Sequence, residues 1–136
     1  MKQVFVDSGA FFALQVAQDA SHAAATEVFA RARSERWRLT TTNAVVIETY
    51  ALLLSRTRTG RAAAISFLDA VDESPLHVER IRPIDERLAV TLLRSHADKT
   101  YSLCDALSFV VMERLGISEA VAYDRHFREY GRFLIL

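Results

Sequence analysis

The chain has 136 residues, the size of one ordinary domain, and 51% of them are hydrophobic, enough for a core without disulfides or a structural metal. The formal net charge is zero, which argues against a strongly basic nucleic-acid coat, and the single cysteine, Cys104, excludes an intramolecular disulfide and a CxxC zinc site. No apolar run is long enough to span a membrane, and Asp7 stands where a signal peptide would be apolar, so we expect a cytoplasmic protein without a membrane partner.

Strand and helix patterns alternate in the first half of the chain. Residues 3–6 (QVFV) form an apolar run ended by Asp-Ser-Gly, which predicts a buried strand that opens into a helix. Residues 22–35 place apolar side chains at helical spacing, and residues 38–42 (RLTTT) have the β-branched character of a strand. The helix that carries Glu48 follows, and Thr59-Gly60 separates it from another helix over 61–73.

The second half continues this alternation. Residues 76–81 (LHVERI) alternate as a strand does, and Pro83 opens a helix that extends to about residue 97. A strongly apolar helix over 102–116, with a serine cap and a glycine stop, precedes a strand over 119–124, a short helix over 125–131 and a strand over 132–136. We therefore expect a single α/β domain over 1–136, with a largely parallel sheet covered by helices on both faces.

Four carboxylates are placed unlike ordinary surface acids. Asp7 and Asp124 each end a predicted strand, so both should lie at the carboxyl edge of the sheet, where such proteins bind ligands. Asp105 stands in the first turn of its helix. Glu48 lies in mid-helix among alanine, valine and leucine, where an isolated carboxylate is costly unless it is paired or protonated.

Helix capping offers another explanation for three of these acids. Asp7 and Asp124 would serve equally as N-caps, and Asp105 stands three residues after Ser102, as in a capping box. Capping does not explain Glu48. If the four acids cluster, they repel one another unless cations lie between them, and such oxygen ligands suit Mg²⁺ or Mn²⁺. A bound ion of this kind polarises a phosphodiester and lowers the pKa of an attacking water.

Four segments in order, which together span nearly the whole chain, resemble PIN-domain proteins, in particular the small bacterial VapC-type toxins. They are VFVDSGAFFAL (4–14), TNAVVIETYALL (42–53), YSLCDALSFVVMERLGI (101–117) and AVAYDRHFREYG (120–131). The resemblance implies a three-layer α/β/α sandwich with a mostly parallel sheet. It also implies a metal-dependent endoribonuclease that cleaves RNA with metal-activated water. One or two Mg²⁺ or Mn²⁺ ions would be held by the matching catalytic acids Asp7, Glu48, Asp105 and Asp124.

The resemblance assigns further roles around these acids. Ser8 and Ser102 match hydroxyl residues that support the metal site. Arg125 and His126 are candidate RNA contacts. The alternative role of Arg125 is the polar side of a short helix, and that of His126 is packing or exposure to solvent. His126 stands where some family members carry a further acid, so the resemblance supports a first ion better than a second.

The resemblance implies partners as well as a substrate. A family member of this kind acts as a toxin, is held inactive by a small antitoxin protein, and pairs as a homodimer. The helix over 61–73 would suit either a dimer interface or core packing. Seven arginines in residues 31–38 and 55–61 would contact nucleic acid or form a solvated helix face.

Other classes of protein remain to be weighed against a nuclease. A PIN-like domain that binds RNA or protein without cutting would carry the same fold, although the presence of all four acids favours cleavage. A phospho-acceptor receiver domain needs paired acids after its first strand and a lysine after a late strand, and only Lys2 and Lys99 are available. A P-loop enzyme is excluded because no GxxxxGK motif occurs. We expect Cys104 to be a small packed residue and not a nucleophile.

Overall fold

The chain folds into five strands and seven helices, and the structure, a computed structural model, describes all residues from 1 to 136. The strands are β1 (Gln3–Val6), β2 (Arg38–Thr42), β3 (His77–Glu79), β4 (Glu119–Val121) and β5 (Leu134–Ile135). The helices are α1 (Ser8–Gln15), α2 (His22–Ser34), α3 (Asn43–Arg56), α4 (Arg61–Glu73), α5 (Pro83–Ser95), α6 (Leu103–Leu115) and α7 (Arg125–Tyr130).

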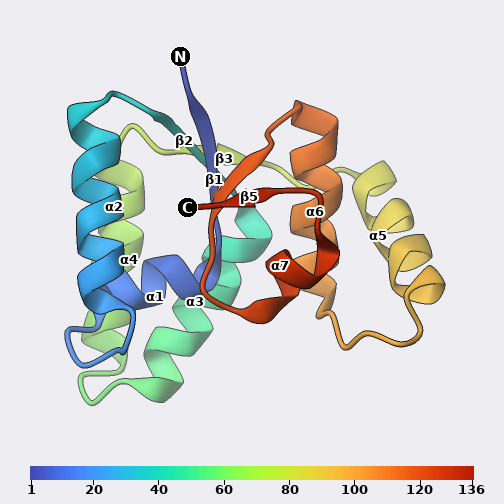
Figure 1. The fold of residues 1–136 in the computed structure, drawn as a ribbon. Helices are drawn as coiled ribbons and strands as arrows, with labels where there is room; N and C mark the ends of the chain where they lie inside the picture. The colour runs from blue at the N-terminus through green and yellow to red at the C-terminus, as the bar shows by residue number, and fades with distance from the viewer.

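The five strands form one sheet in the order β3-β2-β1-β4-β5, and every neighbouring pair is parallel. Helices flank the sheet on both sides, with α2 and α4 at the left of Figure 1 and α5 and α6 at the right. This arrangement confirms the predicted α/β class, and the sheet is wholly parallel where a mostly parallel one was expected. Because parallel strands need crossover connections, a helix follows each of the first four strands.

Most predicted elements are present, and three strands are shorter than the sequence pattern indicates. β3 ends at Glu79 because the backbone N–H of Ile81 leaves the sheet and donates to the side chain of Asn43, 2.9 Å away. β4 ends at Val121, three residues before Asp124, and β5 keeps only Leu134 and Ile135. A strand-like pattern continues past the ends of these strands, by alternation in residues 76–81 and by apolar runs in residues 120–123 and 133–136, so the sequence overestimates their length.

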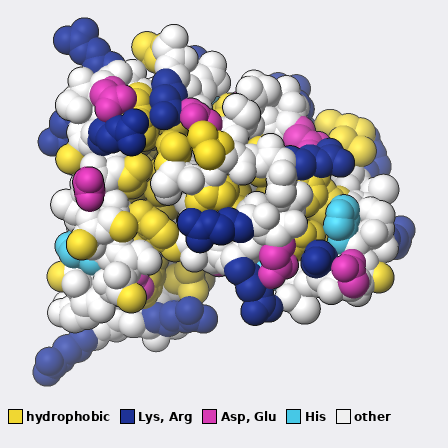
Figure 2. All heavy atoms as spheres, in the orientation of Figure 1, with side chains coloured by type: hydrophobic (Ala, Val, Ile, Leu, Met, Phe, Trp, Pro, Cys, Tyr) yellow, Lys and Arg dark blue, Asp and Glu magenta, His cyan; other side chains and the backbone are white.

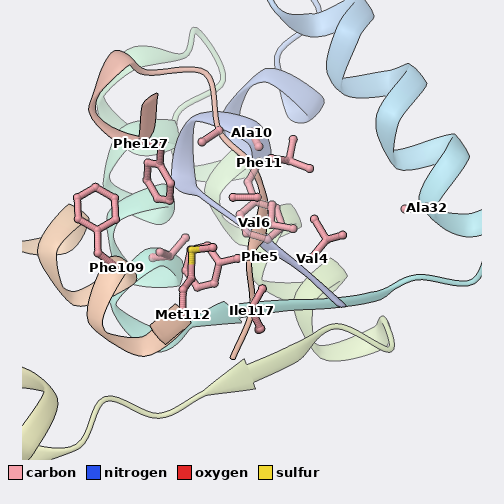
Figure 3. Close-up of a cluster of buried hydrophobic side chains, with 14 of the residues drawn as sticks. Val4, Phe5, Val6, Ala10, Phe11, Ala32, Phe109, Met112, Ile117 and Phe127 are labelled. Atoms are coloured by element: carbon pink, nitrogen blue, oxygen red, sulfur yellow. The ribbon is translucent and has the colours of Figure 1, made fainter. Parts of the chain in front are cut away.

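Strand β1 runs through the centre of the main hydrophobic core. Val4, Phe5 and Val6 are fully buried, and Figure 3 shows Phe5 among side chains from α6 and the C-terminal region. The rings of Phe5 and Phe127 stack with centroids 6.4 Å apart. The Thr41 hydroxyl of β2 donates to the Val6 carbonyl at 2.8 Å, which fixes the end of β1. The residue after this end, Asp7, is therefore held on a rigid base.

Charged side chains of both signs are spread over the face in Figure 2, with apolar side chains between them. The arginine and lysine side chains on this face do not merge into one block. None of the helices has the length and apolar character needed to cross a membrane.

Candidate active site

The neighbouring strands β1 and β4 bring two of the predicted acids to one edge of the sheet. Val6 pairs with Val121, and the backbone N–H of Asp7 donates to the Val121 carbonyl at 3.1 Å. Asp7 therefore follows the end of β1 directly, and Asp124 follows β4 after a two-residue extension. As expected for parallel strands, both lie at the carboxyl ends.

Asp7 is a buried carboxylate with one oxygen that lacks a partner. Its residue is 1% exposed, and its Oδ1 is buried without any hydrogen bond. It occupies the N-cap position of α1, yet its side chain makes no capping bond. Burial raises the pKa of Asp7 well above its ordinary value, and the negative charges of Asp124, Asp105 and Glu48 raise it further. The capping explanation therefore fails for Asp7.

Asp124 and Asp105 do cap their helices, as the alternative explanation proposed. Asp124 accepts from the His126 N–H at 2.9 Å at the start of α7. Asp105 and Ser102 form a reciprocal capping box on α6, with both bonds 3.0 Å long. Partial burial and the nearby Asp105 carboxylate nevertheless raise the pKa of Asp124, so the two acids face a common centre.

Glu48 lies at the border between the buried and exposed sides of α3. Thr49 and Val45 next to it are buried, whereas Ile47 is exposed, and Glu48 itself is half-buried. The Ser8 hydroxyl of α1 donates a hydrogen bond to Glu48 Oε1. Ser8 thus holds the carboxylate that capping could not explain, and no cation from the protein pairs with it.

Cys104 lies close to Glu48 on the buried side of the site. Burial raises the pKa of its thiol, and the negative charges of Glu48 and Asp7 act in the same direction. The side chain also packs against the main core. A group held as a neutral thiol is a poor nucleophile, which agrees with the interpretation of Cys104 as a packing residue.

The donor set fits a hard divalent cation. The four acids offer carboxylate oxygens only. The charges of Glu48, Asp105 and Asp124 all raise the pKa of Asp7. One ligand-type atom each of Asp105, Asp124 and His126 lies within 4.8 Å of the others. An orphaned buried oxygen on Asp7 beside like charges is the chemistry that Mg²⁺ or Mn²⁺ would neutralise.

The buried acids make the stability of the metal-free protein depend on pH. Because the folded-state pKa of Asp7 is raised, the folded chain binds this proton more tightly than the unfolded chain does. The ionised Asp7 carboxylate does not destabilise the fold below the unfolded-state pKa of about 4. Its destabilising effect grows as the pH rises from there to the raised folded-state pKa. We expect wild type to lose stability relative to Asp7→Asn between pH 4 and 8 in EDTA, measured by urea unfolding. A difference that stays constant with pH would contradict this.

Of the other predicted site residues, Ser102 and His126 contact one of the four acids and Arg125 does not. Ser102 supports Asp105 through the capping box. Arg125 is largely exposed in the first turn of α7 and pairs with Glu129 at 3.1 Å, so its role as an RNA contact stays a prediction. The ring of His126 turns inward, where Nδ1 lies 2.7 Å from Asp105 Oδ2.

The sequence analysis missed a second polar cluster, centred on Arg114 in α6. Its guanidinium donates to both carboxylate oxygens of Asp85, at 2.9 and 2.8 Å, and to Glu79 at 2.7 Å. Asp85 belongs to α5 and is fully buried. The sequence signal was weak, because Arg114 stands beside Glu113 in the last turn of α6, where an arginine also suits the helix dipole.

The comparisons with known proteins agree with this fold. A family model described as the PIN domain matches residues 4–133, so the chain belongs to the PIN-domain family. Within that family it is similar to VapC20 of Mycobacterium tuberculosis, a 23S rRNA-specific endonuclease. The two are 34% identical over 128 residues, which cover 94% of each chain, in both the CDC 1551 and H37Rv strains.

Solved structures extend the likeness to three dimensions. The crystal structure of M. tuberculosis VapC20, described as a Sarcin-Ricin loop cleaving toxin, superposes with a TM-score of 0.88 at 32% identity. The match covers 97% of this chain and 98% of that one. VapBC2 from Rickettsia felis, bound to a DNA fragment from its promoter, matches with a TM-score of 0.68 at 12% identity, covering 98% and 97%. The second match reflects the fold alone.

Proposed function

We propose that the chain, as one PIN-like domain over residues 1–136, is an endoribonuclease dependent on Mg²⁺ or Mn²⁺ and the toxin of a toxin–antitoxin pair. The observation that carries the metal dependence is the orphaned, buried carboxylate of Asp7 beside three further acids. The likeness to VapC20 over nearly the whole chain supports the nuclease activity.

The four acids take different parts in this proposal. Asp7, Asp105 and Asp124 would hold the principal ion, and Glu48 would orient water or share a second ion. A bound Mg²⁺ or Mn²⁺ supplies the Lewis acid for phosphodiester hydrolysis. Ser8 holds the Glu48 carboxylate by a hydrogen bond, and the rigid end of β1 keeps Asp7 in place. Such preorganisation lowers the cost of aligning the scissile phosphate.

The choice of RNA substrate to test rests on the likeness to VapC20, because the acids do not select a base sequence. VapC20 is specific for 23S rRNA and cleaves the sarcin-ricin loop, so this stem-loop is the first RNA to test here. The arginines in residues 31–38 and 55–61 and those of α7 would contact the phosphates of this RNA. A small antitoxin that covers the site, a homodimer and a cytoplasmic location complete the proposal.

Cleavage of a synthetic sarcin-ricin stem-loop tests the activity. We expect purified protein to cut it with Mn²⁺ and not with EDTA, and to leave 5′-phosphate and 3′-hydroxyl ends, because water is the nucleophile. Mass spectrometry of the products identifies the ends. A 2′,3′-cyclic phosphate would contradict hydrolysis, since it requires attack by the RNA's own 2′-hydroxyl.

The competing function is a PIN-like domain that binds RNA or protein without cutting. It would predict that Mn²⁺ leaves every RNA intact and that Asp7→Ala loses no metal binding. The strong burial and raised pKa of Asp7 favour cleavage over this alternative, because a binding surface gains nothing from an unpaired buried carboxylate.

A further inference from the structure

The two oxygens of the Asp105 carboxylate are used differently. Oδ2 accepts two hydrogen bonds, from the Ser102 backbone N–H at 3.0 Å and from His126 Nδ1 at 2.7 Å. Oδ1 accepts none from the protein. Both donors approach the same oxygen, so the carboxylate has one occupied oxygen and one that remains free to coordinate.

His126 is held in place from three directions. Its backbone N–H bonds to Asp124 and its Nδ1 to Asp105. Its ring makes a T-shaped contact with the Tyr101 ring, with an interplanar angle of 80° and centroids 5.6 Å apart. Only 20% of its side chain is exposed. Its conformation is therefore defined by the site, unlike that of a solvated surface histidine.

The hydrogen bond to Asp105 decides which nitrogen carries a proton. A carboxylate oxygen accepts only, so Nδ1 must be the donor and has no lone pair to offer a cation. Nε2 lies on the other side of the ring from this bond. In its observed orientation, His126 can thus hold Asp105 but cannot present Nδ1 as a ligand to the centre that Asp105 and Asp124 face.

We propose that His126 is a positioning residue whose Nδ1–H, together with the Ser102 N–H, locks Asp105 Oδ2 and directs Oδ1 toward the metal. This inference rests on the proposed metal-dependent function and adds a residue that acts through Asp105. Partners that orient a metal-binding side chain commonly contribute 10- to 100-fold to metal affinity. The same bond joins α7 to α6, so one histidine links the segments that carry Asp124 and Asp105.

Two substitutions separate this role from simple packing. His126→Ala removes the donor, whereas His126→Asn places an amide N–H near the position of Nδ1 and can restore the bond. We expect His126→Ala to weaken Mn²⁺ binding by about 10- to 100-fold, measured by calorimetry on the full chain without RNA. His126→Asn should recover most of the affinity. His22→Ala, which removes an imidazole from α2, should leave Mn²⁺ affinity unchanged.

The outcomes separate the positioning role of His126 from the proposed nuclease function. If His126→Ala binds Mn²⁺ as wild type does, or if His126→Asn is as weak as His126→Ala, the positioning role is wrong. Nitrogen hyperfine coupling to bound Mn²⁺ that disappears in His126→Asn would also overturn it, because His126 would then be a direct ligand. If wild type itself binds no Mn²⁺ and leaves the stem-loop intact, the proposed function fails. Wild type that binds and cleaves while the variants match it refutes the histidine's role alone.

Discussion

Replacing Asp7 by asparagine is expected to abolish RNA cleavage and, in the same molecule, to stabilise the metal-free fold. The carboxylate is buried, its Oδ1 has no partner, and the charges of Asp124, Asp105 and Glu48 repel it. Asparagine has nearly the same shape and removes the charge. We expect cleavage to fall by roughly 10³-fold or more and the free energy of unfolding in EDTA at pH 7 to rise by about 0.5–2 kcal/mol.

The matched control is Asp69→Asn, which removes a negative charge from an exposed position on α4. It should leave both cleavage and stability nearly unchanged, since exposed substitutions typically stay within about 0.5 kcal/mol. Stem-loop cleavage with Mn²⁺ and urea unfolding in EDTA give the two readouts. An Asp7→Asn protein that is inactive but less stable than wild type would mean that its neighbours do not repel it as described.

Replacing Arg114 by alanine is expected to destabilise the chain strongly. Burial alone would raise the pKa of Asp85, but the Arg114 side chain and the Arg82 backbone N–H hold it below its ordinary value. Without Arg114, the fully buried Asp85 keeps a charge with no ionic partner. Removing one member of a buried pair typically costs about 3–5 kcal/mol, which urea unfolding would measure.

A second arginine provides the comparison for Arg114→Ala. Arg132 pairs with Glu113 at 3.0 Å, but both side chains are substantially exposed, so Arg132→Ala should cost less than about 1 kcal/mol. In addition, Asp85→Asn combined with Arg114→Ala should recover part of the loss, because the uncompensated charge is then absent. If Arg114→Ala and Arg132→Ala destabilised the chain equally, the buried network would not contribute as proposed.

The sequence predicts the sheet well because strand signals and buried positions coincide in β1 and β2. Residues 3–6 and 38–42 are strands in the structure with the predicted bounds, since apolar or β-branched side chains occupy every buried position. The C-terminal strands were overestimated. There, apolar residues continue past the strand ends, and an apolar run alone does not show where a strand stops.

The sequence predicted which acids gather at this edge of the sheet, but it did not predict how their side chains are connected. Strand ends placed Asp7 and Asp124, and the mid-helix position of Glu48 marked it as unusual. Two of the competing explanations also describe the structure correctly, because Asp105 and Asp124 cap their helices while facing the centre. What the sequence could not show is the Ser8–Glu48 bond and the inward turn of His126, since both join elements distant along the chain.

The position of β1 in the middle of the sheet has a consequence for how the protein folds. Phe5 must pair with Ala120, across most of the length of the chain, before Asp7 and Asp124 can meet. Such non-local contacts are costly in chain entropy and form slowly. A partly folded chain that has joined only β1 and β2 contains Asp7 and Glu48 but no complete centre. Completion of the acidic centre is thereby coupled to completion of the fold, so that an unfinished copy lacks the assembled centre.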